Sequence, residues 1–438
     1  MGTNDTYPLL STSAAYAQAT RDQGGSSRLP MKSDAQSRFS LFLRSLSMGR
    51  MHPSRPARRS RLSKRRKGSR GSLSRILRRT WTRPLLLMLV IIFLYAISPT
   101  ESNIAGHFIF LSYKIDNAEG VPGSPPQYGK GLWDLAFVCF YTVFLTFTRE
   151  FVMQELLRPL ARACDIRSRG KQSRFMEQMY TACYVAFMGP LGLWTMRQTP
   201  GLWYFETRGM YESFPHRTHE AVFKFYYLFQ AAFWVQQVVV MILGQEKRRR
   251  DFHELIAHHV ITISLIGLSY RFHFTYMGIA VYVTHDLSDF LLALSKSLNY
   301  ADNPLQAPIF TLCIFAWVYL RHYINLLILY SITTEFRSVG PFELNWETQQ
   351  YKCWISQVIT FGLLAALQVL NLYWLYALFR NAYRFAVLGI RKDDRSDPEE
   401  SEVENEELKM TKNGEATGFN RWSKVRAAAA EAKDGIIA

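Results

Sequence analysis

Five side chains that can carry a proton or attack an electrophile lie inside stretches that are otherwise apolar. An ionised group at the centre of a membrane helix costs roughly 2.5–3.5 kcal/mol on insertion scales, so such groups usually serve a function. A carboxylate beside an imidazole fixes the ring tautomer and raises its basicity, which suits general-base catalysis or nucleophilic acyl transfer. The five are His258 and His259 in one stretch and His285, Asp286 and Asp289 in the next.

The spacing of these residues predicts that they lie at one depth. The stretches 253–271 and 275–297 are joined by a short turn centred near His273. The two histidines lie fifteen and fourteen residues before that turn, and the two aspartates lie thirteen and sixteen residues after it. In an antiparallel helix pair, equal distance from the turn means equal depth, at 1.5 Å per residue. We therefore expect the imidazoles and carboxylates to face each other as one layer.

Three functions are compatible with such a layer. The first is acyl transfer to an amine or hydroxyl of a lipid held between the helices. The second is a metal site, with zinc held by the three histidines and an aspartate; the single His-His pair does not resemble the repeated histidine boxes of membrane di-iron hydroxylases. The third is structural or transport-related, since polar side chains also join membrane helices or line a path.

The elements that position the layer are predicted to be membrane helices. The chain has 438 residues, of which 48% are hydrophobic, and the apolar residues are concentrated in eight segments. Each segment approaches or exceeds the ~20 residues that cross a hydrocarbon core. We predict an all-α multi-pass membrane protein with about eight transmembrane helices, six or seven of them forming a bundle around a lipid cavity. The segments are 84–99, 132–157, 176–195, 219–244, 253–271, 275–297, 306–331 and 354–382.

The distribution of charge predicts the topology. Residues 1–83 hold 19 lysines and arginines and 3 acidic residues, and are predicted to be a disordered basic tail in the cytosol. Positive charge recurs in 158–175 and 245–252, which this count also assigns to the cytosol, as the positive-inside rule requires. The histidine and aspartate layer then lies in the cytosolic half of the membrane, and both termini are cytosolic.

The C-terminal tail, 391–438, is predicted to be acidic and mostly disordered. Residues 393–408 contain nine acidic residues and one arginine. Ser396 and Ser401 each have an acidic residue three positions later, so we regard both as candidate phosphorylation sites for an acid-directed kinase.

The stretch from Arg249 to Tyr300 resembles the signature of the ceramide synthases, the longevity-assurance branch of the TLC-domain membrane proteins, and is most similar to the fungal members. The resemblance rests on three features: Arg249 and Asp251 just before the first helix, the motif HELIAHHVITISLIGLSY from His253, and the motif THDLSDFLLALSKSLNY from Thr284. It extends over roughly 130–385. It implies a transmembrane catalytic domain over those residues that transfers a fatty acyl group from acyl-CoA to the amine of a sphingoid base. A non-enzymatic lipid-binding or translocation-associated member of the TLC family is the alternative.

The resemblance also implies partners, location and roles. It implies residence in the endoplasmic reticulum membrane, no cofactor beyond acyl-CoA, contact with membrane lipids, no nucleic acid, and a homodimer or small accessory membrane subunit. The His/Asp layer would be catalytic, with no metal. Candidate contacts to the phosphates of coenzyme A are Arg174, Arg248, Arg249 and Arg250, and candidate cavity residues are Tyr226, Tyr227 and Arg321.

Arg321 is a further intramembrane charge, and its depth is the basis for predicting its role. It lies fifteen residues after the start of segment 306–331, somewhat beyond the carboxylates. We therefore expect it to make a packing hydrogen bond, to a carbonyl or to Asn325, rather than to act as counter-ion of the carboxylates. Acyl-chain preference is expected to depend on the depth of the cavity and on the loop 332–353.

Overall fold

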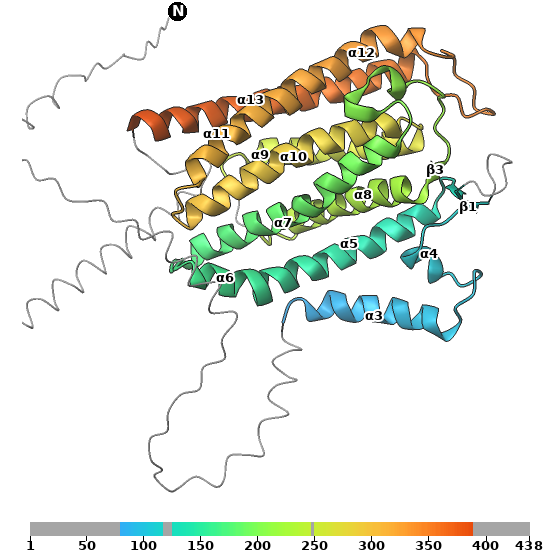
Figure 1. The fold of residues 1–438 in the computed structure, drawn as a ribbon. Helices are drawn as coiled ribbons and strands as arrows, with labels where there is room; N and C mark the ends of the chain where they lie inside the picture. Colours follow the sequence, from blue (N-terminus) through green and yellow to red (C-terminus); the bar gives the residue numbers. More distant parts are fainter. Residues whose placement is uncertain (1–78, 117–124, 247–248, 389–438) are drawn as a thin grey trace, which may run out of the picture. The chain divides into compact units, whose positions relative to one another are not determined.

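Each of the eight predicted apolar segments is helical in the computed structural model, which confirms the all-α class (Figure 1). The helices run up and down in alternation and are joined mainly by short connections. They are α3 (Thr82–Ile97), α5 (Trp133–Phe151) continued by the π-helical segment η1 (Val152–Leu157) and by α6 (Arg158–Ala163), α7 (Arg169–Gln198), α8 (Ala221–Ile242), α9 (Phe252–Arg271), α10 (Thr275–Tyr300), α11 (Gln306–Ala316) continued by the π-helical segment η4 (Trp317–Ile324) and by α12 (Asn325–Ser338), and α13 (Trp354–Leu388).

The structure describes residues 79–116, 125–246 and 249–388, all within one compact unit. The greater part of the predicted basic tail, the whole acidic tail with Ser396 and Ser401, and Arg248 lie outside the described residues.

Within the described ranges, six helices are long and apolar enough to cross a membrane, which confirms a multi-pass membrane protein. Helix α3 is shorter, at 16 residues. Helix α7 has 30 residues but is not among the six; its first turns are charged, and its later, uncharged part contains Gly189, Pro190 and Gly192. The six are Trp133–Ala163, Ala221–Ile242, Phe252–Arg271, Thr275–Tyr300, Gln306–Ser338 and Trp354–Val387.

The basic stretch 158–175, which lies between two of the predicted apolar segments, is helical over most of its length and is not a loop. Helix α6 occupies its first third and α7 begins at Arg169. The extra turns of α7 are stabilised by local polar contacts, because Arg174 pairs with Glu177 at 3.3 Å and Ser173 donates to the same carboxylate at 3.1 Å. Ion pairs between side chains three or four positions apart thus extend α7 beyond its apolar part.

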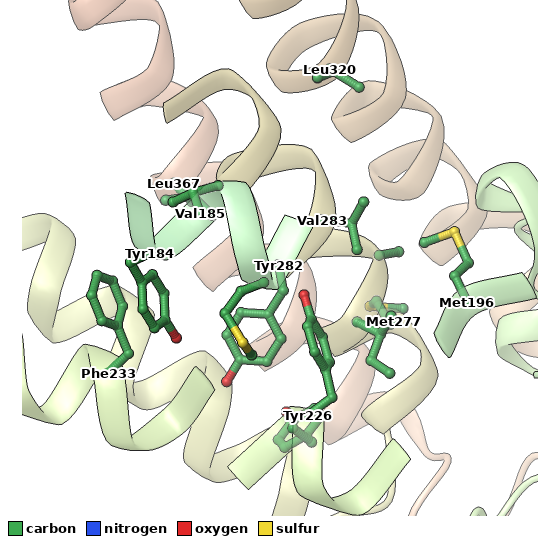
Figure 2. Close-up of a cluster of buried hydrophobic side chains, with 14 of the residues drawn as sticks. Tyr184, Val185, Met196, Tyr226, Phe233, Met277, Tyr282, Val283, Leu320 and Leu367 are labelled. Atoms are coloured by element: carbon green, nitrogen blue, oxygen red, sulfur yellow. The ribbon is translucent and has the colours of Figure 1, made fainter. Parts of the chain in front are cut away.

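Helix α10 lies at the centre of the packing and contacts α7, α8, α9, α11, η4 and α12. Its buried apolar face joins a large core cluster that includes Met277, Tyr282 and Val283 (Figure 2). In the same cluster the rings of Tyr184 and Phe233 stack with centroids 3.7 Å apart. The core thus fixes α10, and with it the segment that carries His285 and the two aspartates.

A glycine permits the close approach of α7 to this centre. A Cβ atom at Gly192 would lie 2.4 Å from the Tyr226 hydroxyl and 2.9 Å from Val283. Gly189, one turn earlier on the same helix, has room, since its Cβ would lie 3.8 Å from the nearest side-chain atom, on Val185. Gly192 is therefore the position on α7 where any side chain would displace Tyr226.

We expect Gly192→Ala to lower the free energy of unfolding by about 1–3 kcal/mol, the usual cost of overpacking a core. Gly189→Ala is the matched control and should be tolerated, because helix propensity favours alanine. The measurement is thermal unfolding of the detergent-solubilised protein by tryptophan fluorescence. Equal melting temperatures for the two variants would contradict the packing argument.

One end of the bundle, here called the sheet end, carries three two-residue strands. They are β1 (Lys114–Ile115), β2 (Gln127–Tyr128) and β3 (His219–Glu220), paired antiparallel in that order. Lys224, fully buried on α8, forms an ion pair with Asp134 at 2.7 Å and donates to the carbonyls of Ser112 and Gly129. This lysine joins the connecting segments to the helices, since a buried charge must be paired and hydrogen-bonded.

A cluster of basic side chains lies beside the strands. Lys130 donates to the carbonyl of His216 at 2.8 Å and lies 3.2 Å from Nδ1 of His273. Burial, with the positive charge of Lys130 as a smaller cause, lowers the pKa of His216 from 6.5 to about 4 and that of His273 to about 3. Lys352, Arg271 and Arg217 add positive charge near these rings.

These pKa values predict that acid destabilises the sheet end. An unfolded histidine binds a proton below about pH 6.5, whereas folded His216 resists protonation down to about pH 4, so stability is complete above pH 6.5 and lost as the pH falls through that window. Between pH 7.5 and 5.5 we expect a loss of about 1.4 kcal/mol for each such histidine. Thermal unfolding across this range should depend less on pH in His216→Gln. An identical pH dependence in the variant would refute the assignment.

Candidate active site

Helices α9 and α10 bring the predicted layer together. His258, His259, His285 and Asp286 are all buried, with exposed fractions of 3–7%. The rings of His258 and His259 lie 5.7 Å apart, nearly perpendicular to each other. Asp289 is partly open, with 31% of its side chain exposed. The counting from the turn at His273 therefore predicted the right neighbours.

Two cavities meet at this layer. A polar cavity of about 290 Å³ is lined by both histidines, both aspartates, Glu177, Glu246, Arg249, Lys296 and Arg321, with apolar residues of α8 between them. An apolar cavity of about 220 Å³ extends from His258 and His285 toward the sheet end, where Phe272, Phe274, Leu344, Trp346 and Tyr351 line it. His258 and Trp234 line both cavities. A molecule with a polar head and an apolar chain can thus occupy both spaces with its junction at His258.

The two aspartates are held by different partners. Asp286 accepts hydrogen bonds from Gln230 and, at 3.5 Å, from the Tyr226 hydroxyl. Tyr184 completes this neutral network by donating to Gln230 at 3.0 Å. Asp289 instead pairs with Arg321 at 2.6 Å. Among the described residues, no hydrogen bond joins either carboxylate directly to His258 or His259, so the expected carboxylate–imidazole contact is absent from this arrangement.

The expected hydrogen bond from Arg321 to a carbonyl is present, but the expectation that Arg321 is not a counter-ion is wrong, because its side chain pairs with Asp289. Besides Asp289, its guanidinium donates to Ser288 at 2.6 Å, to the His285 carbonyl at 3.2 Å and to Asn371 at 3.2 Å. The indole ring of Trp317 covers it, 3.9 Å from the central carbon. Arg321 therefore joins α10, η4 and α13 at the layer.

The depth estimate failed because it located a Cα atom and not a side chain. Arg321 lies 15 residues after Gln306 and Asp289 lies 11 residues before Tyr300, a difference of four residues or about 6 Å. Helical side chains point toward the helix N-terminus, so the arginine extends back over that distance. It also lies in π-helical η4, and π-helical turns often occur at functional sites.

His285 is part of the layer but has no free ring nitrogen. Its Nδ1 lies 2.8 Å from the Val281 carbonyl, to which only a protonated nitrogen can donate, and its Nε2 lies 3.3 Å from the amide of Asn371. His259 also donates from Nδ1, to the Leu255 carbonyl at 2.7 Å, which leaves its Nε2 available. The Nδ1 atom of His258 is buried and has no hydrogen-bond partner. His258 and His259 are therefore the rings that can react.

The predicted phosphate contacts differ in position. Arg249 lines the polar cavity and Arg250 is exposed nearby in the sequence. Arg174 is buried in its pair with Glu177 and does not line either cavity. Lys296, which the sequence argument did not select for this role, lines the polar cavity. Tyr227 lines the apolar cavity, where its hydroxyl bonds Ser269.

Several contributors to the site were not selected from the sequence. Gln230 holds Asp286, and Ser288 and Asn371 hold Arg321. Their signal was available, since amides and hydroxyls within apolar helices mark polar networks. Across the described ranges, no group of three or more His, Cys, Asp or Glu side chains is arranged to hold a metal ion.

Removal of Arg321 should expose the cost of the buried charge. We expect Arg321→Leu to lower the free energy of unfolding by about 3 kcal/mol, because Asp289 loses its counter-ion. Adding Asp289→Asn to that variant should restore part of the loss, since the remaining amide is neutral. The melting temperatures of the single and double variants check this. A double variant less stable than Arg321→Leu would show that the ion pair is not the cause.

Comparison with known proteins identifies the family. The TLC domain matches residues 174–380. Sphingosine N-acyltransferase-like protein FUM17 of Gibberella moniliformis is 60% identical over 76% of this chain and 86% of its own length. Sphingosine N-acyltransferase lac1 of Schizosaccharomyces pombe is 44% identical over 79% and 88%, and ceramide synthase LAG1 of Saccharomyces cerevisiae is 46% identical over 76% and 80%. These matches extend well beyond the two helices of the site, and the chain belongs to the fungal ceramide synthases of the TLC-domain family.

Proposed function

We propose that this protein transfers a fatty acyl group from acyl-CoA to the amine of a sphingoid base and so makes a ceramide. The observation that supports it most directly is the position of His258, which lines both the polar and the apolar cavity. The names of the relatives, sphingosine N-acyltransferase and ceramide synthase, favour this activity over a non-enzymatic lipid-binding function.

The two cavities match the two parts of an acyl-CoA. The acyl chain belongs in the apolar cavity, and the coenzyme A head belongs in the polar cavity beside Arg249 and Lys296. The thioester carbonyl then lies next to His258. Leu344, Trp346 and Tyr351, from the connection before α13, line the far end of the apolar cavity and would limit the length of the chain.

The proposed chemistry has two steps. A ring nitrogen of His258 attacks the thioester carbonyl, the C–N bond forms and the C–S bond breaks. The proton on the other ring nitrogen of His258 passes to the departing thiolate, so coenzyme A leaves as the thiol and a neutral acyl-imidazole stays behind. The sphingoid amine then attacks the acyl-imidazole, the new amide bond forms, and the bond to His258 breaks. The proton lost by the amine passes to a base of the layer, for which Nε2 of His259 and Asp286 are both available, and from that base to the departing His258 ring, which regains the proton that it gave up in the first step.

The cellular setting is also a proposal. A basic N-terminal tail and the positive-inside rule support an endoplasmic reticulum protein with both termini in the cytosol. The polar cavity then opens on the side where soluble acyl-CoA is supplied. The need for no cofactor other than acyl-CoA, and the homodimer or small accessory subunit, stay predictions from the family resemblance.

The test is ceramide formation by the purified protein from a fatty acyl-CoA and sphinganine. We expect His258→Ala to lower the rate at least 100-fold, within the range that loss of one proton-transferring or nucleophilic group costs. Ser264→Ala is the matched control on α9, because the hydroxyl of Ser264 donates to the Val260 carbonyl of its own helix. Intact-mass analysis after mixing with acyl-CoA alone should show a gain of one acyl chain in the wild type. Normal ceramide synthesis by His258→Ala would overturn the proposal.

A further inference from the structure

The ring of His258 is oriented by packing and not by hydrogen bonds. Its Nδ1 is buried and has no hydrogen-bond partner among the residues that the structure describes. Two indoles enclose the ring edge to face: Trp234 at 5.4 Å and Trp374 at 5.2 Å between centroids, with interplanar angles of 69° and 76°. Most reactive histidines are oriented by a hydrogen bond to the second ring nitrogen. Here the orientation depends on how firmly the two indoles are held.

Contacts among the described residues anchor one of these indoles and not the other. The Nε1 atom of Trp234 is buried without a hydrogen-bond partner. The Nε1 atom of Trp374, on α13, donates at 3.3 Å to Oδ2 of Asp251, the residue immediately before α9. Asp251 is 2% exposed and Trp374 is 7% exposed, so this bond is shielded from water. It links the start of the helix that carries His258 to the indole that packs on His258.

Asp251 is itself held in one geometry. The guanidinium of Arg249 binds it in a bidentate pair, with Nε at 2.9 Å from Oδ1 and Nη2 at 2.8 Å from Oδ2. Two parallel hydrogen bonds fix the plane of a carboxylate. Arg249 also lines the polar cavity. The chain of contacts therefore runs from a cation at the polar cavity, through a buried carboxylate and an indole, to the reactive ring.

We infer that Asp251 is a positioning residue for the acyl-transfer step, and that it acts on His258 through the indole of Trp374. The inference rests on the proposed function, because it concerns how readily His258 meets the acyl carbon. Without the Asp251 bond, Trp374 keeps its contact area but loses a fixed ring plane, and His258 samples orientations that do not face the thioester. Misplacement of a reacting group by a fraction of its own size is enough to slow a reaction markedly.

The experiment measures the first step alone. Wild type, Trp374→Phe, Asp251→Ala and the double variant are mixed with a fatty acyl-CoA, without sphingoid base, and acyl-enzyme is followed by intact mass. Trp374→Phe keeps a six-membered aromatic ring and removes the five-membered ring of the indole together with its N–H. We expect each single variant to form acyl-enzyme roughly tenfold more slowly. In Trp374→Phe, the acyl-CoA concentration that gives half the maximal rate should change little.

The double variant separates positioning from two independent structural effects. If Asp251 acts through Trp374, the double variant is about as slow as either single variant. Asp251→Asn should recover most of the rate lost in Asp251→Ala, because its amide oxygen can still accept from the indole. Multiplied effects in the double variant, about 100-fold, or a wild-type rate in Trp374→Phe would overturn the inference.

A second readout does not depend on acyl transfer. Diethyl pyrocarbonate acylates imidazoles, and peptide mass spectrometry can compare its reaction with His258 and with His259 in the same molecule. His259 is the internal reference, because the Leu255 carbonyl holds its ring. We expect the His258 to His259 ratio to change at least threefold in Trp374→Phe and Asp251→Ala. A wild type that makes no acyl-enzyme would refute the proposed two-step chemistry, and one that makes no ceramide would refute the proposed function, whereas an unchanged ratio would refute the positioning role.

Discussion

The ion pair between Arg321 and Asp289 is the interaction on which the site depends. A buried arginine is tolerated only where its charge and its donors are all satisfied. Its partners come from three segments: Asp289, Ser288 and the His285 carbonyl on α10, Asn371 on α13, and Trp317 beside it in η4. The requirement to satisfy one guanidinium thus brings three helices to the same depth. Helix α9 then adds the two histidines to a layer that is already defined.

The Arg321–Asp289 ion pair also gives the two carboxylates different surroundings. Asp289 has a permanent cation beside it, at 2.6 Å. Asp286 has only the neutral donors Gln230 and Tyr226. Two acids in one site with such different surroundings usually have different roles. Asp289 is engaged by its counter-ion, and Asp286 is the carboxylate left to exchange a proton with a substrate. Gly192 on α7 supports the hydrogen bond from Tyr226 to Asp286, because its missing side chain leaves room for the Tyr226 hydroxyl.

The sequence predicted those features that depend on counting along one helix or across one turn. The pairing of α9 with α10 followed from distances to His273, and the eight helices followed from apolar length. Side-chain contacts between segments far apart in the chain could not be counted in this way. Arg321 reaches Asp289 by the direction of its side chain, and Asp251 meets Trp374 across 123 positions. The two cavities depend on how α8, α9, α10 and α13 pack, which apolar periodicity does not specify.

His258 lines both cavities, and this position limits the order in which the two substrates can bind in the proposed reaction. In the part of the chain that the structure describes, the polar cavity adjoins the apolar cavity at His258. In the proposed reaction the coenzyme A head and the sphingoid amine both occupy that polar cavity. Two reactants that need the same space must use it in turn. In the proposed reaction, coenzyme A therefore leaves before the sphingoid base enters, and the acyl group stays bound to His258 between the two steps. Such a cycle gives parallel lines in double-reciprocal plots of rate against either substrate, whereas intersecting lines would mean that both substrates are bound together.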